Sequence, residues 1–419
     1  EDPDGIVHLE VQRPAPTQEI LLRTDDTPGF GWRGLAPADL GDHAVRTEGQ
    51  GLTNGLVTVI PDQSDGTFAI DGVAGFGRLV DDGDAGDTYN WSPATFDGPI
   101  HRPEDVDVLV SEAGPVRGRI EIERRYRWPT HVEGGEDGDG ETGRRVGEVA
   151  VIVSTVVELR AGEDLVRLSV AFTNPACDHR LRVLLPLPEP AQTSLAECAF
   201  GTVERGLEAE GGPNEQPLAT YPSRRFVSAG GLLVVHDGTG EYELVDRDVD
   251  AAGAARALAV TLLRSVGVIS RGPMTMRALP AGPPVPTPGA QMLGPHHVEL
   301  VLHLGGRDPY AVADEAQPLL TARRRGGTGL GEPDSSGQAL AVEGAEVSAL
   351  TRRPDGRLEL RVVETAGQPT TLRVPGRCGE LTDLAGRPLG LPFDGELDME
   401  PHRIVTLALD EPLGGAHRR

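Results

Sequence analysis

Residues 149–159 read VAVIVSTVVEL, a run in which β-branched side chains predominate. Such side chains are stiff at the first rotatable bond and pack well on a pleated surface, so the run predicts a long β-strand. Residues 165–172, LVRLSVAF, alternate between apolar and polar side chains, which is the period of a strand with one buried face. Both segments therefore predict extended structure in the middle of the chain.

Strand patterns of the same kind recur along the whole chain. Turn signals at Thr53-Asn54-Gly55 and Asp65-Gly66 predict a hairpin over residues 52–71. Residues 308–316 begin with an Asp-Pro pair and predict a short helix or a connector. Many short strands with polar turns predict stacked antiparallel sheets and an all-β fold. The other predicted strands are residues 6–11, 117–126, 181–187, 232–236, 258–263, 298–304, 347–352, 357–364, 370–374 and 403–409.

The length and composition of the chain predict more than one β-domain. Its 419 residues exceed an ordinary single domain, and its 55 glycines and 35 prolines are spread along the sequence. Glycine and proline set turn geometry, so they favour short strands over long helices. We predict amino-terminal strands that join or bridge the domains, a large β-sandwich, a connector and linker, and a small carboxy-terminal β-sandwich, at residues 1–47, 48–305, 306–339 and 340–419.

The charge of the chain argues against two classes of partner. The net charge is −26 at pH 7, and lysine is absent, so every Lys-or-Arg position is an arginine. Such a surface repels the phosphates of nucleic acids and anionic membranes, and we expect neither as a partner. No apolar run is long enough to span a bilayer and no signal peptide is visible, which favours a cytoplasmic location.

Three further features of the sequence lead to expectations about disulfides, metal binding and the extent of the polypeptide. Cys177, Cys198 and Cys378 are too few for a disulfide framework, and they lack the spacing of a zinc site. Residues 134–143 are rich in Gly, Asp and Glu but miss the calcium-loop spacing, so we predict a solvated hairpin tip. The chain opens without Met and strand-like sequence follows at once, so we expect a piece of a longer polypeptide or a processed one.

Several short runs occur in a fixed order along the chain. They are LTNGLV at residues 52–57 with DGTF at 65–68, LVDDGDAGDTYNWSP at 79–93, NPACDHRLR at 174–182, TYPSRRFV at 220–227, and LAVTLLRSVG at 258–267 with PTPGAQ at 286–291. In this order they resemble the carboxy-terminal half of glycoside hydrolase family 38, the α-mannosidases, over about residues 50–305. The tail, PHRIVTLAL at residues 401–409, resembles the last strand of that family's terminal sandwich.

The resemblance implies a large antiparallel super-β-sandwich of the galactose-mutarotase-like kind, followed by a small sandwich. It also implies that one zinc ion and an aspartate nucleophile belong to an amino-terminal catalytic domain, for which this sequence has no counterpart. His296-His297 precedes Val-Glu and does not match the family's histidine-rich zinc motif. We therefore expect no metal, cofactor or catalytic residue in this chain, and zinc in the catalytic domain of the same enzyme, its expected partner.

The resemblance further points to residues that would face a mannose-containing glycan. In the family, a tyrosine in the loop equivalent to residues 84–93 reaches into the mannose pocket, and Tyr89 stands at that place. Its hydroxyl would bond a sugar hydroxyl while its ring closes the pocket wall. We predict a substrate-pocket rim made of this tyrosine with Asp87, Asn90, Arg264 and Arg271.

Each of these residues has a structural alternative. Tyr89 is alternatively a loop-packing residue, and Arg264 and Arg271 are alternatively ion-pair partners within or between sheets. Asp84 and Asp87 flank the tyrosine and invite comparison with the paired acids of a retaining glycosidase, but turn capping is the better interpretation.

Three neighbouring residues are interpreted as structural. Trp91 is expected in the core rather than as a platform for a sugar. His179 and Arg180 follow an Asn-Pro turn, and we predict a polar network there rather than catalysis.

Three functions follow from these observations. The first is the accessory part of an α-mannosidase-like glycoside hydrolase, which supports the catalytic domain, contributes to the glycone pocket rim and is inactive alone. The second is a stand-alone carbohydrate-binding module, which needs exposed aromatic residues, and an aromatic content of 4% weighs against it. The third is a mutarotase-like enzyme or a lyase, and the His and Glu pair that a mutarotase needs is not found near the motifs.

Overall fold

The computed structural model describes residues 20–410, except 25, 35, 95–97, 135–142, 249–252 and 318–335. Within these residues most regular structure is β-strand, and the strands pair in antiparallel fashion. The predicted all-β fold is confirmed. The predicted strand at residues 6–11, most of the segment 134–143, and residues 318–335 of the predicted connector and linker lie outside the described residues.

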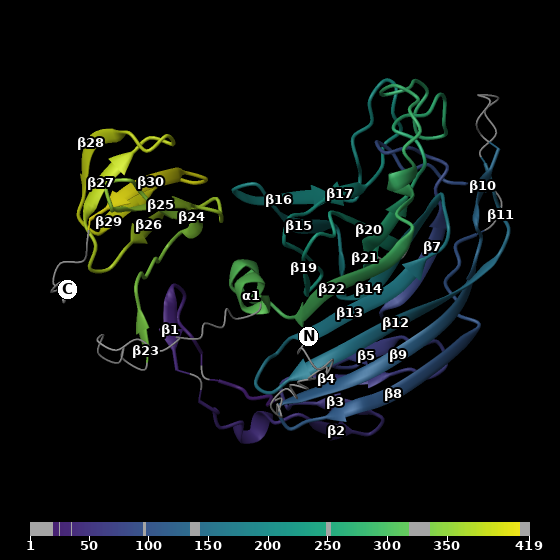
Figure 1. Cartoon of the computed structure of the whole chain (residues 1–419), viewed down its shortest axis with the longest axis horizontal. Helices are drawn as coiled ribbons and strands as arrows, with labels where there is room; N and C mark the ends of the chain where they lie inside the picture. Colours follow the sequence, from purple (N-terminus) through teal and green to yellow (C-terminus); the bar gives the residue numbers. More distant parts are fainter. Residues whose placement is uncertain are drawn as a thin grey trace, which may run out of the picture.

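A curved nine-stranded sheet forms one layer of the large sandwich (Figure 1). Its long central strands contain the most strongly patterned runs of the sequence, and their side chains alternate between core and solvent because successive residues point to opposite faces. In sheet order the strands are β16 (Gly201–Gly206), β15 (Thr193–Cys198), β18 (Phe226–Ala229), β19 (Leu232–His236), β22 (Gly294–Leu304), β13 (Val166–Asn174), β12 (Val149–Arg160), β9 (Arg117–Trp128) and β8 (Asp105–Ala113).

Two five-stranded sheets face the same core. The first has the order β17 (Thr220–Pro222), β20 (Glu241–Asp248), β21 (Ala254–Ser265), β14 (His179–Ala191) and β7 (Arg78–Gly83). The second has the order β2 (Arg46–Glu48), β3 (Gly51–Thr53), β4 (Thr58–Pro61), β5 (Phe68–Ile70) and β6 (Val73–Phe76), which includes the predicted hairpin over residues 52–71.

One continuous apolar core joins these three sheets. Ile120 and Ile122 of the nine-stranded sheet belong to the same buried cluster as Val183 of the first five-stranded sheet and Phe68 of the second. None of these side chains is more than 1% exposed. Burial of apolar surface contributes roughly 25 cal/mol per Å², so the three sheets are stabilised together rather than one by one. Loops that leave different sheets are therefore held on one rigid base.

A small sandwich with its own core follows in the chain (Figure 1). Leu360, Val362, Leu372 and Leu407 are wholly buried in that core. Its larger sheet has the order β24 (Glu346–Arg352), β25 (Leu358–Val363), β30 (Ile404–Leu409), β27 (Gly379–Thr382) and β28 (Pro388–Phe393), and β26 (Thr370–Arg373) pairs with β29 (Glu396–Met399).

Short elements connect these units. The predicted helix is confirmed as α1 (Pro309–Ala316), and the Asp308 side chain caps it by accepting from the Tyr310 N–H at 3.2 Å. In the amino-terminal segment, β1 (Gly31–Arg33) pairs with β23 (Ser336–Gln338), while β2 belongs to the large sandwich. The predicted segment boundaries themselves stay predictions. The remaining elements are the pair β10 (His131–Glu133) and β11 (Arg144–Val146), and the 3-10 turns η1 (Gly41–His43) and η2 (Pro288–Gln291).

None of the helices within the described part of the chain has the length and apolar character needed to cross a membrane.

A buried asparagine explains the LTNGLV motif. Asn54 donates from Nδ2 to the carbonyls of Arg160 at 2.7 Å and Glu163 at 2.6 Å, which lie at the turn between β12 and β13. Its Oδ1 accepts from the N–H groups of Leu56 and Val57, each at 3.0 Å. The asparagine is wholly buried, and the glycine after it has a φ of 81°, a value that glycine adopts freely. The motif therefore fastens one sheet to another.

Replacement of Asn54 by alanine should lower the free energy of unfolding by about 3 kcal/mol, because four backbone groups would lose their partner. Urea unfolding followed by circular dichroism measures this change. The control is Asn214→Ala at an exposed position, with an expected change within about 0.5 kcal/mol. An effect of Asn54→Ala no larger than that of the control would contradict the fastening role.

Candidate functional site

Two loops lie side by side at one end of the first five-stranded sheet. β14 pairs antiparallel with both β7 and β21, so these two strands run in the same direction and end at the same edge. The loop of residues 84–93 follows β7, and the loop of residues 266–287 follows β21. Thr88 joins them, because its Oγ1 donates to the Ile269 carbonyl at 2.8 Å. The sheet thus brings together segments that are far apart in sequence.

Asp84 organises the first loop from inside. Its side chain is wholly buried. One carboxylate oxygen accepts from the N–H groups of Gly86 at 2.9 Å and Ser92 at 3.2 Å, and the other accepts from Nε of Arg264 at 2.7 Å. Burial raises the pKa of Asp84 above its ordinary value, and the Arg264 guanidinium opposes that shift. Asp84 therefore stabilises the fold of the loop that contains it.

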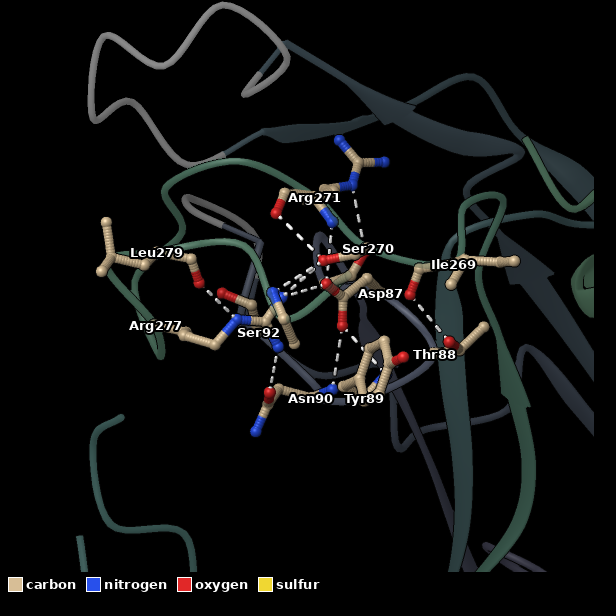
Figure 2. Close-up of polar contacts among 12 residues, drawn as sticks. Asp87, Thr88, Tyr89, Asn90, Ser92, Ile269, Ser270, Arg271, Arg277 and Leu279 are labelled. Carbon is tan, nitrogen blue, oxygen red and sulfur yellow. Dashed lines mark hydrogen bonds and ion pairs between the residues drawn. The ribbon is translucent and has the colours of Figure 1, made fainter. Parts of the chain in front are cut away.

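Asp87 joins the two loops (Figure 2). Its Oδ1 accepts from the N–H groups of Tyr89 at 2.9 Å and Asn90 at 3.0 Å, and its Oδ2 accepts from the Arg271 N–H at 2.8 Å and from the Arg277 guanidinium. Burial acts to raise the pKa of Asp87, but the hydrogen bonds from Arg277 and the three backbone groups outweigh it and lower the pKa. The carboxylate is therefore held ionised.

Both aspartates are thus occupied by hydrogen-bond donors of the protein. Each of the four carboxylate oxygens accepts at least one hydrogen bond from the protein. This geometry agrees with turn capping and not with a pair of catalytic acids, which would need free oxygens facing a substrate.

Arg277 is the residue of this site that sequence reasoning missed. It is 3% exposed and donates to Asp87, to Asn90 Oδ1, to Ser270 Oγ at 3.2 Å and to the Leu279 carbonyl at 2.7 Å. The sequence around it, GPMTMRALP at residues 272–280, carries no recognisable pattern. The one signal in the sequence that could have pointed to Arg277 is its position six residues after Arg271, in the same loop.

Tyr89 is the residue that these contacts present to the outside. Its side chain is 56% exposed, although the loop beneath it is buried. The Arg277 guanidinium lies 5.8 Å from the centre of its ring, within the range of a cation–π contact. A Cβ atom at Gly282 would stand 3.1 Å from the Tyr89 hydroxyl oxygen, so the absence of a side chain there leaves room for the tyrosine. Among the described residues this hydroxyl has no hydrogen-bond partner.

The five residues predicted for the pocket rim come together, although their action on a substrate stays a prediction. Arg264 donates from Nη2 to the Asp87 carbonyl at 2.5 Å, and Arg271 donates from Nε to the Gly86 carbonyl at 3.0 Å. Both arginines therefore hold the loop that carries Tyr89. Asn90 is half-buried with its amide oxygen on Arg277. Of the five, the tyrosine alone is exposed.

The neighbouring residues have structural roles, although Trp91 does not lie in the core, where the sequence predicts it. Trp91 is half-buried, donates from Nε1 to the Gly83 carbonyl at 3.2 Å and covers the Arg180 guanidinium at 4.1 Å. His179 is buried, with Nδ1 at 2.6 Å from an Asp81 carboxylate oxygen. These contacts fix β7 and β14 beneath the loop.

No group of three or more His, Cys, Asp or Glu side chains in the described ranges is arranged to hold a metal ion. The histidine pair on β22 has other contacts. His296 stacks on Phe172 with ring centres 5.3 Å apart, and His297 Nε2 lies 2.7 Å from Ser169 Oγ.

Part of the outer face of the nine-stranded sheet is polar. A hollow of about 410 Å³ on this face is lined largely by charged and polar side chains, including Arg119, Glu158, Arg167, His297 and Glu299. The exposed aromatic residues in the described part of the chain lie in loops or in the short strand β1; they are Phe30, Trp32, Tyr89 and Phe200. None of these four exposed aromatic side chains lies on a strand of the nine-stranded sheet or of the five-stranded sheets.

Replacement of Asp87 by asparagine should lower the free energy of unfolding by about 3 kcal/mol at neutral pH, because it leaves the buried Arg277 without its counter-ion. The folded-state pKa of Asp87 is lowered, so its stabilisation is present above the ordinary value of 3.8 and is lost as the pH falls through the folded-state value. The deficit of Asp87→Asn should therefore shrink in acid.

Urea midpoints of the variant and the unmodified chain, compared at neutral pH and below pH 3.8, test this expectation. Asp107→Asn, at an exposed position on β8, is the matched control and should behave like the unmodified chain at both pH values. A neutral-pH deficit for Asp87→Asn no larger than that of the control would show that Asp87 does not hold the loops together.

The chain is similar in sequence to one curated protein. No family model matches the chain. The chain is 25% identical over 290 residues to a curated protein of Halalkalibacterium halodurans named "Putative mannosylglycerate hydrolase", a match that covers 63% of this chain and 29% of that protein.

Two solved structures from Enterococcus faecalis share the fold, each with a TM-score of 0.70. One is an alpha-mannosidase, 21% identical, with 87% of this chain and 42% of that chain covered. The other is a protein in glycosyl hydrolase family 38, 20% identical, with 89% and 45% covered. The matches thus span less than half the length of each of these three proteins. Over that part, the comparisons confirm the resemblance to glycoside hydrolase family 38 that the sequence motifs indicate.

Proposed function

We propose that this chain is the accessory, carboxy-terminal part of an α-mannosidase-like glycoside hydrolase, in which it supports the catalytic domain and contributes Tyr89 to the rim of the glycone pocket. The observation that carries the proposal is an exposed tyrosine on a loop that buried ion pairs hold in place. A phenol ring offers an apolar face to a sugar ring, and its hydroxyl both donates and accepts. The match to parts of longer family-38 structures supports the proposal.

The bond-breaking chemistry is assigned to the rest of such an enzyme. The described residues offer no ligand set for the zinc that the family implies, so no step through zinc is assigned to them. The carboxylate oxygens of Asp84 and Asp87 already accept hydrogen bonds from the protein. Neither residue is therefore placed to attack or protonate a glycosidic bond. In this proposal the partner is the catalytic domain, the ligand is a mannose-containing glycan, and the location is cytoplasmic.

The purified chain should not hydrolyse aryl α-mannosides, because no metal site is found among its described residues and the Asp84 and Asp87 carboxylates are occupied by protein donors. Release of the aryl group in the presence of added zinc measures this activity. Calorimetry with mannose and mannobiose should show weak binding or none. Turnover that depends on zinc and is abolished by a chelator would overturn the proposal, and tight sugar binding by the chain alone would favour a stand-alone module.

The role of Tyr89 is tested in the enzyme assembled with its catalytic domain. Tyr89→Phe removes one hydrogen bond to the sugar, and kcat/KM should fall by about tenfold, the equivalent of ~1.4 kcal/mol. Tyr89→Ala also removes the ring and should lower kcat/KM further. Leu109→Ala, at a position on β8 that is 61% exposed, is the control and should leave kcat/KM unchanged. Full activity of Tyr89→Ala would exclude the tyrosine from the pocket.

A further inference from the structure

An uncharged stretch of sequence begins in the second loop of the candidate site. Charged residues make up 25% of the chain, yet residues 278–298 contain no Asp, Glu, Lys or Arg. Within this stretch Leu279 is 56% exposed and Val285 is 46% exposed. Pro283 and Pro284, which precede the valine, are exposed as well. Large apolar side chains that gather on a protein surface mark a site of interaction.

Leu279 and Tyr89 lie next to the same buried arginine (Figure 2). Arg277 donates from Nε to the Leu279 carbonyl at 2.7 Å, and its guanidinium lies 5.8 Å from the centre of the Tyr89 ring. Gly282 approaches the same ring, because a Cβ atom at that glycine would stand 3.5 Å from Cε2 of the tyrosine. The leucine and the tyrosine are therefore neighbours on one surface.

Val285 is fixed against the same two loops by its backbone. Its carbonyl accepts from the Ile269 N–H at 2.9 Å, and the Ile269 carbonyl accepts from Thr88, the residue before the tyrosine. Proline fixes φ, so the segment that leads to the valine is also stiff. A surface whose backbone is fixed beforehand loses little conformational freedom when a partner binds. We call this surface the loop-end face; its members are Tyr89, Leu279, Pro283, Pro284 and Val285.

We propose that the loop-end face is the surface on which the catalytic domain docks, an inference that rests on the proposed accessory function. The cores of stable interfaces are depleted of charged residues and enriched in aromatic ones, and this face has both properties. More than half of each of the two Enterococcus faecalis structures lies outside the part that this chain matches, so a large remainder of each protein is available to cover such a face. In the proposed function that remainder corresponds to the catalytic domain.

A second copy of this chain is a poorer occupant of the face. Each copy has a net charge of −26, so association of two copies brings like charges together. The catalytic domain also accounts for the place of Tyr89, because pockets for small ligands form preferentially where domains meet. Docking on the loop-end face puts the tyrosine at such a boundary. We therefore expect a partner surface that is apolar and uncharged where it meets Leu279 and Val285.

Labelling of exposed side chains with a photoactivated carbene, followed by mass spectrometry, tests the proposal. The chain alone is compared with the enzyme assembled with its catalytic domain. Labelling of Leu279 and Val285 should fall by at least about fivefold on assembly, because the core of an interface excludes the reagent. Leu389 and Leu391 on β28 are exposed to a similar degree and should keep their labelling.

A double variant, Leu279→Asp with Val285→Asp, introduces two charges into the loop-end face and should undo docking. In the assembled enzyme that carries it, labelling of the prolines of the face should return to the level of the chain alone. The matched control, Leu384→Asp with Leu389→Asp, changes two exposed leucines of the small sandwich and should keep the protection. Circular dichroism of each variant chain confirms that it is folded.

Labelling of the loop-end face that is unchanged on assembly would overturn the proposal, while protection of a different face would leave the accessory function standing. A chain that does not assemble with the catalytic domain at all would overturn both. Protection that the chain shows by itself as its concentration is raised, and that the double variant loses, would assign the face to a second copy instead.

Discussion

The buried ion pair between Asp87 and Arg277 is the interaction on which the loop end of the large sandwich depends. Its members lie 190 residues apart in the sequence, so no local preference brings them together. Each group is at most 3% exposed, and a buried charge without its partner is strongly destabilising. The pair therefore closes the two loops as a unit, and Tyr89 is carried on a backbone that the protein interior holds in place.

The sheet beneath makes this pair possible. Because β14 pairs antiparallel with β7 on one side and β21 on the other, two loops of opposite halves of the chain emerge at one edge. The second buried pair, Asp84 with Arg264, lies where the loops leave the sheet. The two pairs are balanced in charge.

The strands could be predicted from the sequence because their information is local. The β-branched run at residues 149–159 became β12, and the Asp-Pro pair before α1 caps the helix as expected. The capping roles of Asp84 and Asp87 were also accessible, since both stand in a Gly-rich turn. Arg277 was not, because its partners belong to another loop and nothing in its own surroundings marks it.

The arginine-only composition is consistent with this design. An arginine presents a planar fork of donors, so one side chain can serve several acceptors at once, as Arg277 does at four residues. A lysine at these positions would offer a single point charge. At Arg277 all of these acceptors are supplied from within the chain.

In this structure a half-exposed tyrosine, Tyr89, sits on a rigid, internally bonded loop. Amide hydrogen exchange at Tyr89 and Asn90, whose N–H groups both donate to Asp87, tests it most directly. If the two loops are locked by the buried pair, both amides should exchange as slowly as those of the neighbouring strands, despite the exposure of the Tyr89 side chain. Exchange of these two amides at the rate of an unstructured peptide would contradict the account.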